Sequence, residues 1–215
     1  MELNNSIEIL LNYFHQLTDV QQRQFAQLYD LYLDWNEKIN VISRKDIHQL
    51  YERHVLHSLS ISRFVHFRDQ AKVLDVGTGG GFPGIPLAIL FPEVQFTLID
   101  SIGKKIRVAE DVAAQIGLTN VRLLHENAKE EKGKYDFVVS RAVMNAAELV
   151  KLIQKNISKK HVHSIPNGLI CLKGGELDDE ISALKRSCEV VNLSDYFQEE
   201  FFETKKIMYV PIPVK

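Results

Sequence analysis

The sequence predicts an α/β fold in which a parallel, doubly wound sheet follows a small helical unit. Three observations support this fold class. Up to residue 66 the apolar residues recur at helical spacing, whereas from residue 71 short apolar runs alternate with helical stretches. One of those runs, residues 72–76, leads directly into a glycine-rich turn and the first turn of a helix. We therefore expect a helical N-terminal extension over residues 1–66 and a sheet-based core over residues 67–215.

Length and composition indicate a globular chain. Its 215 residues, 45% hydrophobic and 25% charged, can bury one large core. No apolar run approaches the roughly 20 residues of a membrane span, and the N-terminus lacks the basic and apolar regions of a signal peptide. We therefore expect a cytoplasmic protein with no membrane partner. In that compartment Cys171 and Cys188 are expected to be buried, reduced thiols.

The charge balance limits how the chain could bind a nucleic acid. Its formal net charge is −2, whereas strong non-specific binding to phosphates needs a large basic surface. Any RNA would have to be held by a few well-placed cations and by shape.

Three helices are expected in the N-terminal extension. The first covers residues 5–17, and the second begins at a capping box formed by Thr18 and Gln21 and continues to Ile39. The third follows residues 43–46 and buries an apolar stripe that ends at Leu59. Together these helices are expected to form a lid or cap on the main domain.

Seven strands are expected in the core. Between the early ones lie predicted helices near residues 84–91, 104–116 and 145–156. Loop-like sequence separates the last two strands, which indicates a late antiparallel pair. The expected strands cover residues 72–76, 95–100, 121–125, 135–140, 168–173, 188–193 and 207–213.

The glycine-rich turn contains five glycines within the eight positions of residues 77–84. Glycine lets the backbone approach a ligand closely and adopt positive φ angles without a steric penalty. The helix that follows directs its free N–H groups and the positive end of its dipole into the same space. A strand, a glycine turn and a helix in this order predict a site for a nucleotide-type cofactor.

One interpretation of the turn is a dinucleotide site. Gly79, Gly81 and Gly84 satisfy the G-x-G-x-x-G pattern. Asp100 follows at about the 20-residue interval expected for an acid that binds a ribose.

The other interpretation rests on the acid before the glycines. Asp75, Gly77, Gly79 and Gly81 form a pattern that resembles motif I of class I S-adenosylmethionine (SAM) methyltransferases. A carboxylate at the strand end would repel a pyrophosphate, whereas SAM carries an ammonium and a sulfonium that it attracts. Asp100 can accept two ribose hydroxyls in either case. The acid favours SAM, and seven strands with a late antiparallel pair match the class I layout, a Rossmann-like sheet whose last strand is antiparallel.

Further motifs extend the resemblance to nearly the whole chain. It resembles the bacterial small-subunit ribosomal RNA methyltransferases once called glucose-inhibited division protein B. The Phe-Pro-Gly-Ile-Pro sequence within the glycine-rich segment is far more specific than the glycines alone. The matching segments are Trp-Asn-Glu-Lys-Ile-Asn at 35–40, Arg-His-Val-Leu-His-Ser at 53–58, the glycine-rich segment at 75–86, Asp-Ser-x-x-Lys-Lys at 100–105, Ser-Arg-Ala at 140–142 and Leu-Lys-Gly at 172–174.

The resemblance implies a specific reaction. A methyl group would pass from SAM to N7 of a guanine in the 530 loop of 16S rRNA, which is guanine 527 in the family. The partner would be 16S rRNA within a 30S subunit or an assembly intermediate, and we expect the enzyme to be a monomer. Because the net charge is low, free RNA is expected to be a poor substrate.

Two features depart from the family pattern. His57 stands where the family usually has Asp, so a role assigned to that carboxylate does not transfer to this chain. The basic segment 158–163 is longer than usual and is expected to form a solvated loop that could alter contacts at the substrate rim.

Absent motifs agree with a guanine N7 target. After the fourth expected strand there is no Asn-Pro-Pro-Tyr or Asp-Pro-Pro-Tyr, which would grip an exocyclic amine, and no Pro-Cys nucleophile for a pyrimidine ring. That strand ends instead in Ser140 and Arg141. Guanine N7 has an in-plane lone pair and bears no proton, so its methylation needs no general base. Catalysis then consists of holding N7 in line with the methyl–sulfur bond.

The class I layout also implies which residues bind the cofactor. Phe82 is expected to pack on the methionine portion, and residues 127–129 are expected to contact the adenine through a backbone amide. No metal is expected. The full predicted cofactor set is Asp75, Gly77, Gly79, Gly81, Phe82, Asp100, Ser101, Asn127, Ala128, Lys129 and Arg141.

Basic side chains are the predicted RNA contacts. As the catalytic positioning residue, Arg141 is expected to hold guanine O6 or a flanking phosphate through its bidentate guanidinium. It is not expected to donate to N7, which must keep its lone pair. The predicted RNA-binding set is Arg53, His54, Lys104, Lys105 and Lys173, for which a core histidine and solvated charges are the ordinary structural alternatives.

Two rival functions use the same features. One is an NAD(P)-linked oxidoreductase that binds its dinucleotide at the glycine turn. The other is a ribosome-binding protein that keeps the SAM fold without turnover.

Overall fold

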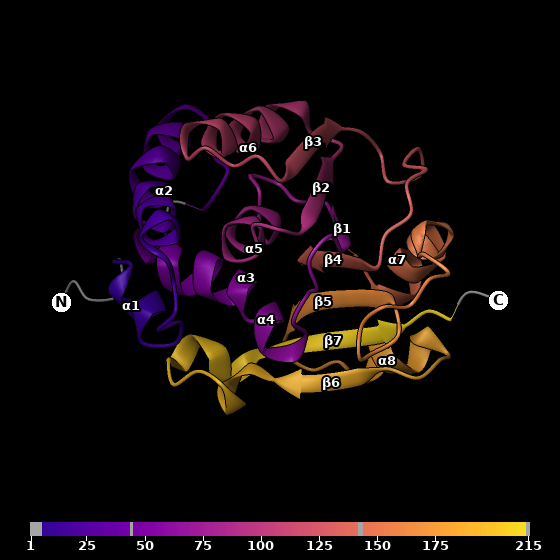
Figure 1. The fold of residues 1–215 in the computed structure, drawn as a ribbon. Coiled ribbons are helices and arrows are strands. Elements are labelled where there is room, and N and C mark those ends of the chain that lie inside the picture. The colour runs from indigo at the N-terminus through magenta and orange to yellow at the C-terminus, as the bar shows by residue number, and fades with distance from the viewer. Residues whose placement is uncertain (1–5, 44, 142–143, 214–215) are drawn as a thin grey trace.

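The computed structural model describes residues 6–43, 45–141 and 144–213, so Arg44 and Ala142 of the predicted motifs lie outside the described residues. Within that range one mixed sheet of seven strands forms the centre of the molecule (Figure 1). Its strand order is β3-β2-β1-β4-β5-β7-β6. β7 pairs antiparallel with both β5 and β6, while the other pairs are parallel. The predicted class I layout with an antiparallel last strand is therefore confirmed.

All seven predicted strands form, with boundaries shifted by at most two residues. The fourth begins later than expected because Tyr135 makes only an isolated bridge to Ile157. The strands are β1 (Lys72–Val76), β2 (Gln95–Asp100), β3 (Val121–His125), β4 (Phe137–Arg141), β5 (Gly168–Gly174), β6 (Glu189–Asn192) and β7 (Lys205–Pro211).

Helices cover both faces of the sheet (Figure 1). α5 (Gly84–Leu90) and α6 (Gly103–Gln115) lie on one face, together with the N-terminal helices. α7 (Ala146–Ile153) and α8 (Asp178–Leu184) lie on the other. α8 was not predicted, and it holds three acidic residues in its first turn.

Alternation along the strands divides the core into two parts. Val73 and Leu98 belong to the large hydrophobic cluster beneath α5, α6 and the N-terminal helices. Their chain neighbours Leu74 and Ile99 belong to the smaller cluster beneath α7 and α8. Successive side chains of a strand point to opposite faces, so these buried strands are apolar at nearly every position.

The second N-terminal helix forms as predicted, but the first and third do not. α2 (Asp19–Lys38) begins at the capping box, in which the Thr18 side chain accepts from the backbone N–H of Gln21. α1 is only Glu8–Leu11, because the chain then turns so that Tyr13 can bind Glu199 and pack against Phe197.

The third predicted helix is broken into short pieces. They are a 3-10 turn (Ile47–Gln49), a π-helical turn (Tyr51–Leu56), α3 (His57–Leu59) and α4 (Ile61–Phe64). Three serine hydroxyls, those of Ser58, Ser60 and Ser62, donate to carbonyls three or four residues earlier. Such bonds compete with the regular helical pattern and bend a helix.

The N-terminal helices share their hydrophobic core with the sheet domain. The Trp35 indole donates to Asp111 of α6 at 2.7 Å, and the Gln24 side chain donates to the carbonyl of Ile116 at 3.0 Å. α2 therefore packs along the side of the sheet domain and is tied to it by hydrogen bonds.

The expected burial of both cysteines is corrected in part. Both cysteines are free, but only Cys171 is buried, and Cys188 is half-buried. None of the described helices is both long enough and apolar enough to cross a membrane.

Candidate functional site

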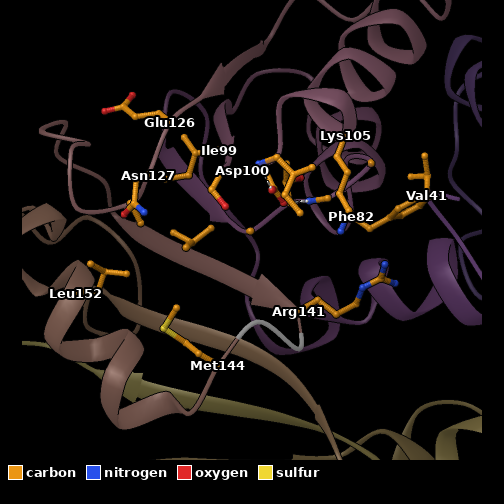
Figure 2. A pocket seen from close by; sticks show the side chains of 18 residues that line it. Val41, Phe82, Ile99, Asp100, Lys105, Glu126, Asn127, Arg141, Met144 and Leu152 are labelled. Atoms are coloured by element: carbon orange, nitrogen blue, oxygen red, sulfur yellow. Dashed lines mark hydrogen bonds between the residues drawn. The ribbon is translucent and has the colours of Figure 1, made fainter. Parts of the chain in front are cut away.

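A cavity of about 470 Å³ opens at the carboxyl ends of β1, β2 and β4 (Figure 2). Its volume falls within the range of roughly 300–1,000 Å³ typical of small-molecule sites, and its place is where open α/β sheets bind ligands. In Figure 2, Asn127 and Leu152 lie at one end, Lys105, Phe82 and Val41 lie at the other, and Asp100 lies between.

The glycine loop between β1 and α5 forms one wall. Gly77, Gly79 and Gly81 have φ angles of 70°, 58° and 108°, which only glycine adopts without strain. A Cβ on Gly84 would lie 2.6 Å from Cγ of Leu98, so this position must also lack a side chain for α5 to pack on β2. The glycines are therefore required by the shape of the loop itself.

Asp75 holds the loop from below. One of its carboxylate oxygens accepts from Thr78 Oγ1 at 2.6 Å and from the backbone N–H of Gly84 at 2.8 Å. The side chain is fully buried, and it does not line the cavity. Burial raises the pKa of its carboxyl to about 7, although both hydrogen bonds act in the opposite direction. Asp75 thus shapes the loop, which differs from the cofactor contact predicted for it.

Asp100 holds the loop from the side and also faces the cavity. One oxygen accepts from the backbone N–H of Gly79 at 2.8 Å, and the other accepts from that of Ile102 at 2.8 Å. Each carboxylate oxygen has two lone pairs, so each keeps one acceptor site for a ligand. A pair of neighbouring hydroxyls on a ligand is the natural partner for such a carboxylate.

Arg141 and Phe82 form the wall near the end of β4. The guanidinium carbon of Arg141 lies 5.1 Å from the centre of the Phe82 ring, a cation–π arrangement. Burial lowers the pKa of Arg141 to about 10, so it remains a cation at neutral pH. Among the described residues no ion pair links it to a carboxylate. Its charge is therefore free to meet a negative or electron-rich group in the cavity.

His54 and His57 lie behind this wall. The His54 ring packs on Phe82 at 5.4 Å between centroids, and the His57 ring lies edge-on to Phe201 at the same distance. Burial, assisted by the charge of Arg141, lowers the pKa of His54 to about 3 and lowers that of His57 well below its usual value. Both rings are thus neutral core groups near neutral pH, and neither lines the cavity.

These two histidines predict an acid-sensitive fold. Between about pH 3 and 6.5, His54 stays neutral in the folded chain but gains a proton in the unfolded chain. The contribution of each histidine to the free energy of unfolding is therefore largest above about pH 6.5, and it falls below that pH by up to about 1.4 kcal/mol per pH unit. The raised pKa of Asp75 acts in the opposite direction, but the two histidines together outweigh it. Urea unfolding at pH 7.5, 6.5 and 5.5 measures this slope. The variant His54→Gln should show a shallower slope, and an unchanged slope would contradict the assignment.

The structure brings most of the predicted cofactor residues together. Asp75, Gly81 and Lys129 do not line the cavity, and Lys129 is exposed. The predicted residues that do line it are Gly77, Gly79, Phe82, Asp100, Ser101, Asn127, Ala128 and Arg141.

The predicted RNA-binding residues are more scattered. Lys105 lines the cavity, while Lys104, its neighbour on α6, does not. Arg53 forms an ion pair with Asp46 at 2.7 Å. The ammonium of Lys173 is largely buried, 2.6 Å from a carboxylate oxygen of Glu180, and it also donates to the carbonyl of Met144. Lys173 therefore links β5 to α8 and to the start of the segment before α7.

The basic segment 158–163 lies away from the cavity, which corrects its expected place at the substrate rim. The His163 ring packs on Phe137, the first residue of β4, at 4.9 Å, and it accepts from the backbone N–H of Arg68. These contacts are at the amino end of the strand whose carboxyl end carries Arg141. As predicted, the segment is a loop in which Lys159, Lys160 and His161 are exposed, and the His161 ring accepts from the backbone N–H of Asn167.

Sequence reasoning missed several residues of the wall. Glu126 directly follows β3, so its place after a strand was a usable signal, whereas Val41 and Leu152 come from segments with no motif. The missed lining residues are Val41, Val76, Thr78, Gly80, Ile99, Ile102, Glu126, Met144 and Leu152.

The donor set suits an organic ligand with hydroxyls and charge. The two ends of the cavity differ. At one end Asn127 offers a backbone segment and Leu152 an apolar surface, whereas at the other Lys105 offers a cation beside the bare backbone of Gly79 and Gly80. Within the described ranges, no group of three or more His, Cys, Asp or Glu side chains is arranged to hold a metal ion.

Comparisons with known proteins agree with this geometry. A family model described as rRNA small subunit methyltransferase G matches residues 21–208. A protein of Bacteroides thetaiotaomicron named ribosomal RNA small subunit methyltransferase G is 63% identical over 206 residues, which cover 96% of this chain and 100% of that one. A protein of the same name from Christiangramia forsetii is 51% identical over 210 residues, which cover 98% of this chain and 99% of that one.

Solved structures agree at the level of the fold. A mutant of MtNAS crystallised with S-adenosylmethionine aligns with a TM-score of 0.58 at 13% identity, covering 94% of this chain and 80% of that one. Precorrin-6y C5,15-methyltransferase from Geobacter metallireducens aligns with a TM-score of 0.55 at 12% identity, covering 80% and 91%.

Proposed function

Since this chain belongs to the rRNA small subunit methyltransferase G family, whose members methylate small-subunit ribosomal RNA with SAM, we propose that its target is N7 of a guanine in the 530 loop. The observation that carries this proposal is the wall at the end of β4. There a cationic guanidinium lies over an aromatic ring, and the nearby titratable groups His54, His57 and Asp75 do not line the cavity.

The cavity fits SAM in the order of the cofactor's parts. Asp100 retains acceptor sites for the two ribose hydroxyls, and the segment at Asn127 and Ala128 can contact the adenine. The methionine portion would then extend past Gly79 toward Lys105. When bound, SAM supplies an electrophilic methyl group on a sulfonium.

The protein's own contribution is positioning. The two carboxylates on the cavity wall, Asp100 and Glu126, stand at the ends of β2 and β3, whereas Arg141 ends β4 on the other side of β1. Among the described residues that line the cavity, none beside Arg141 could act as the base for a reaction that needed a proton removed at the target atom. Guanine N7 bears no proton, so a cation that binds O6 or a phosphate and an aromatic wall that orients the base are sufficient.

The experiment that tests the proposed target uses RNA from cells. Small-subunit RNA is isolated from cells with and without this gene, digested to nucleosides, and analysed by mass spectrometry. We expect 7-methylguanosine to be lost in the deletion strain and restored by the gene. Cleavage of the RNA backbone at 7-methylguanosine with borohydride and aniline then locates the site. An unchanged nucleoside profile would refute the proposal.

Two further measurements separate the rivals. Calorimetry with NADH and with S-adenosylhomocysteine distinguishes an oxidoreductase from a methyltransferase, because only the latter compound should bind. Methyl transfer to assembled 30S subunits and to free 16S rRNA is then compared. We expect the assembled particle to be preferred, and transfer to neither would favour a ribosome-binding protein without turnover.

Lys105 and Lys104 give a matched pair for the cofactor's orientation. Both are lysines in the first turn of α6, but only Lys105 lines the cavity. If the methionine carboxylate lies at that end, Lys105→Gln should weaken binding of S-adenosylhomocysteine about tenfold, as expected for loss of a charge-assisted hydrogen bond. Lys104→Gln should leave it unchanged. 5′-Methylthioadenosine lacks the amino-acid portion, so its affinity should be the same for both variants; equal effects on both ligands would contradict the orientation.

A further inference from the structure

The glycine loop is held by the N-terminal helices as well as by the sheet domain. The hydroxyl of Tyr32, on α2, donates to the carbonyl of Gly80 at 2.7 Å. Tyr32 is fully buried, and its ring packs on Phe82 at 4.8 Å between centroids. A buried carbonyl needs a partner, and here a helix from the extension supplies it.

A second contact comes from the segment just after α2. The Asn36 side-chain oxygen accepts from the backbone N–H groups of Val41 and Ile42, both at 3.0 Å, and so fixes the turn between them. The turn places Val41 against Gly80, where a Cβ on the glycine would lie 2.2 Å from Cγ1 of Val41. Val41 also lines the cavity.

These two contacts enclose the same residue. Within the described residues the Gly80 carbonyl accepts no hydrogen bond from the sheet domain, and its own face toward the cavity is bare backbone. We propose that Tyr32 and Val41 are positioning residues that hold Gly80 in the conformation that binds the cofactor. The N-terminal extension is then a part of the cofactor site, and the affinity for cofactor depends on it.

This inference rests on the proposed cofactor, and its first test uses two matched tyrosines. Tyr51 is also buried in the N-terminal unit, and its hydroxyl donates to the carbonyls of Phe25 and Ala26 at 2.8 and 3.1 Å, neither of which belongs to a residue that lines the cavity. Tyr32→Phe and Tyr51→Phe each remove one buried hydroxyl that donates to the backbone. A purely structural role predicts that both variants behave alike.

We expect them to differ in cofactor binding. Tyr32→Phe should raise the Kd for S-adenosylhomocysteine about tenfold, because the freed loop populates the binding conformation less often. Tyr51→Phe should leave the Kd within about twofold of the native value. The melting temperatures of the two variants should fall by similar amounts. In steady-state assays Tyr32→Phe should raise the KM for SAM more than it lowers kcat. Equal Kd values for both variants would overturn the inference.

The second test exchanges the sizes of two side chains in contact. Gly80→Ala should impair binding by tenfold or more, since its new Cβ would overlap Cγ1 of Val41. Adding Val41→Ala removes that atom and leaves the nearest neighbours, Cβ of residue 41 and Cε1 of Tyr32, at 3.6 Å, an ordinary contact distance. The double variant should therefore recover most of the lost affinity, to within about threefold of Val41→Ala alone.

The outcomes distinguish a failure of this inference from a failure of the proposed cofactor. If the native protein does not bind S-adenosylhomocysteine, the proposed cofactor is wrong. If it binds, but the double variant is no better than Gly80→Ala, the contact between Val41 and Gly80 does not set the loop and the inference fails. Thermal melting of each unliganded variant confirms that the chain remains folded during these titrations.

Discussion

Replacing Arg141 with alanine is expected to lower kcat/KM for methyl transfer to RNA by about 100- to 1,000-fold. Removal of one preorganised donor from an active site typically costs this much. Arg141 ends β4 at the cavity, is held over Phe82, and remains a cation despite burial. Its loss removes the cation proposed to bind O6 or a phosphate, while Asp100 and the glycine loop remain in place. The measurement is transfer of a labelled methyl group to 30S subunits lacking the modification.

Two control variants sharpen the result. Arg141→Lys keeps the charge but not the bidentate guanidinium, so it should restore only a small part of the activity. Arg122→Ala removes an exposed arginine on β3 that does not line the cavity, and it should have little effect. Affinity for S-adenosylhomocysteine should fall by less than tenfold in Arg141→Ala. If activity and cofactor affinity fell in parallel, Arg141 would act on the cofactor and its proposed role toward the RNA would be refuted.

Replacing Asp75 with alanine is expected to give the largest loss of stability, about 3 kcal/mol or more. Its carboxylate is the acceptor for Thr78 Oγ1 and for the backbone N–H of Gly84. Each buried donor left without a partner costs roughly 1–3 kcal/mol, and the shortened side chain also leaves a void. Urea unfolding measures the loss. The glycine loop should also lose its shape, so that S-adenosylhomocysteine no longer binds.

The variant Asp75→Asn separates the shape of this side chain from its charge. Asparagine retains one acceptor oxygen for the same two donors, and burial already raises the pKa of Asp75 to about 7. The raised pKa means that the folded chain holds the proton more tightly than the unfolded chain, so ionisation of Asp75 reduces stability as the pH rises from about 4 to 7. Asp75→Asn should therefore be about as stable as the native protein at pH 7.5.

The same variant tests why an acid leads the glycine turn. If the carboxylate attracts the sulfonium directly, Asp75→Asn should weaken binding of SAM, which carries that charge, more than binding of S-adenosylhomocysteine, which does not. Because Asp75 lies outside the cavity wall, we expect the ratio of the two affinities to change by less than about twofold. A large selective loss of SAM would restore the electrostatic interpretation.

Local patterns in the chain were sufficient for the fold class and the place of the site. Short apolar runs, separated by helical stretches, located the strands because a central strand that is buried on both faces must be apolar at nearly every position. The capping box at Thr18 is likewise a contact between near neighbours in the chain, so it could be predicted. The glycines of residues 77–84 located the site because a turn with positive φ angles and close backbone packing requires glycine at those positions.

Predictions failed where distant residues decide a local conformation. The helix expected over residues 5–17 ends at Leu11 because Tyr13 turns to reach Glu199, which is 186 positions away in the chain. Lys173 was expected to contact RNA, yet in the fold its ammonium is enclosed beside Glu180 of α8, a helix that was not predicted. The sequence around a lysine does not distinguish one that binds a phosphate from one that pairs with a buried carboxylate.

The sequence alone therefore determined that this chain has a class I methyltransferase sheet, a glycine-rich cofactor turn and an arginine at the end of the fourth strand. These features depend on the backbone conformation and burial of short segments, which the local sequence restricts directly. Only the tertiary structure decided that Asp75 shapes the loop from beneath, that Lys105 but not Lys104 faces the cavity, and that Tyr32 and Val41 enclose Gly80. Such contacts join segments far apart in the chain, and they exist only once the helices have packed against the sheet.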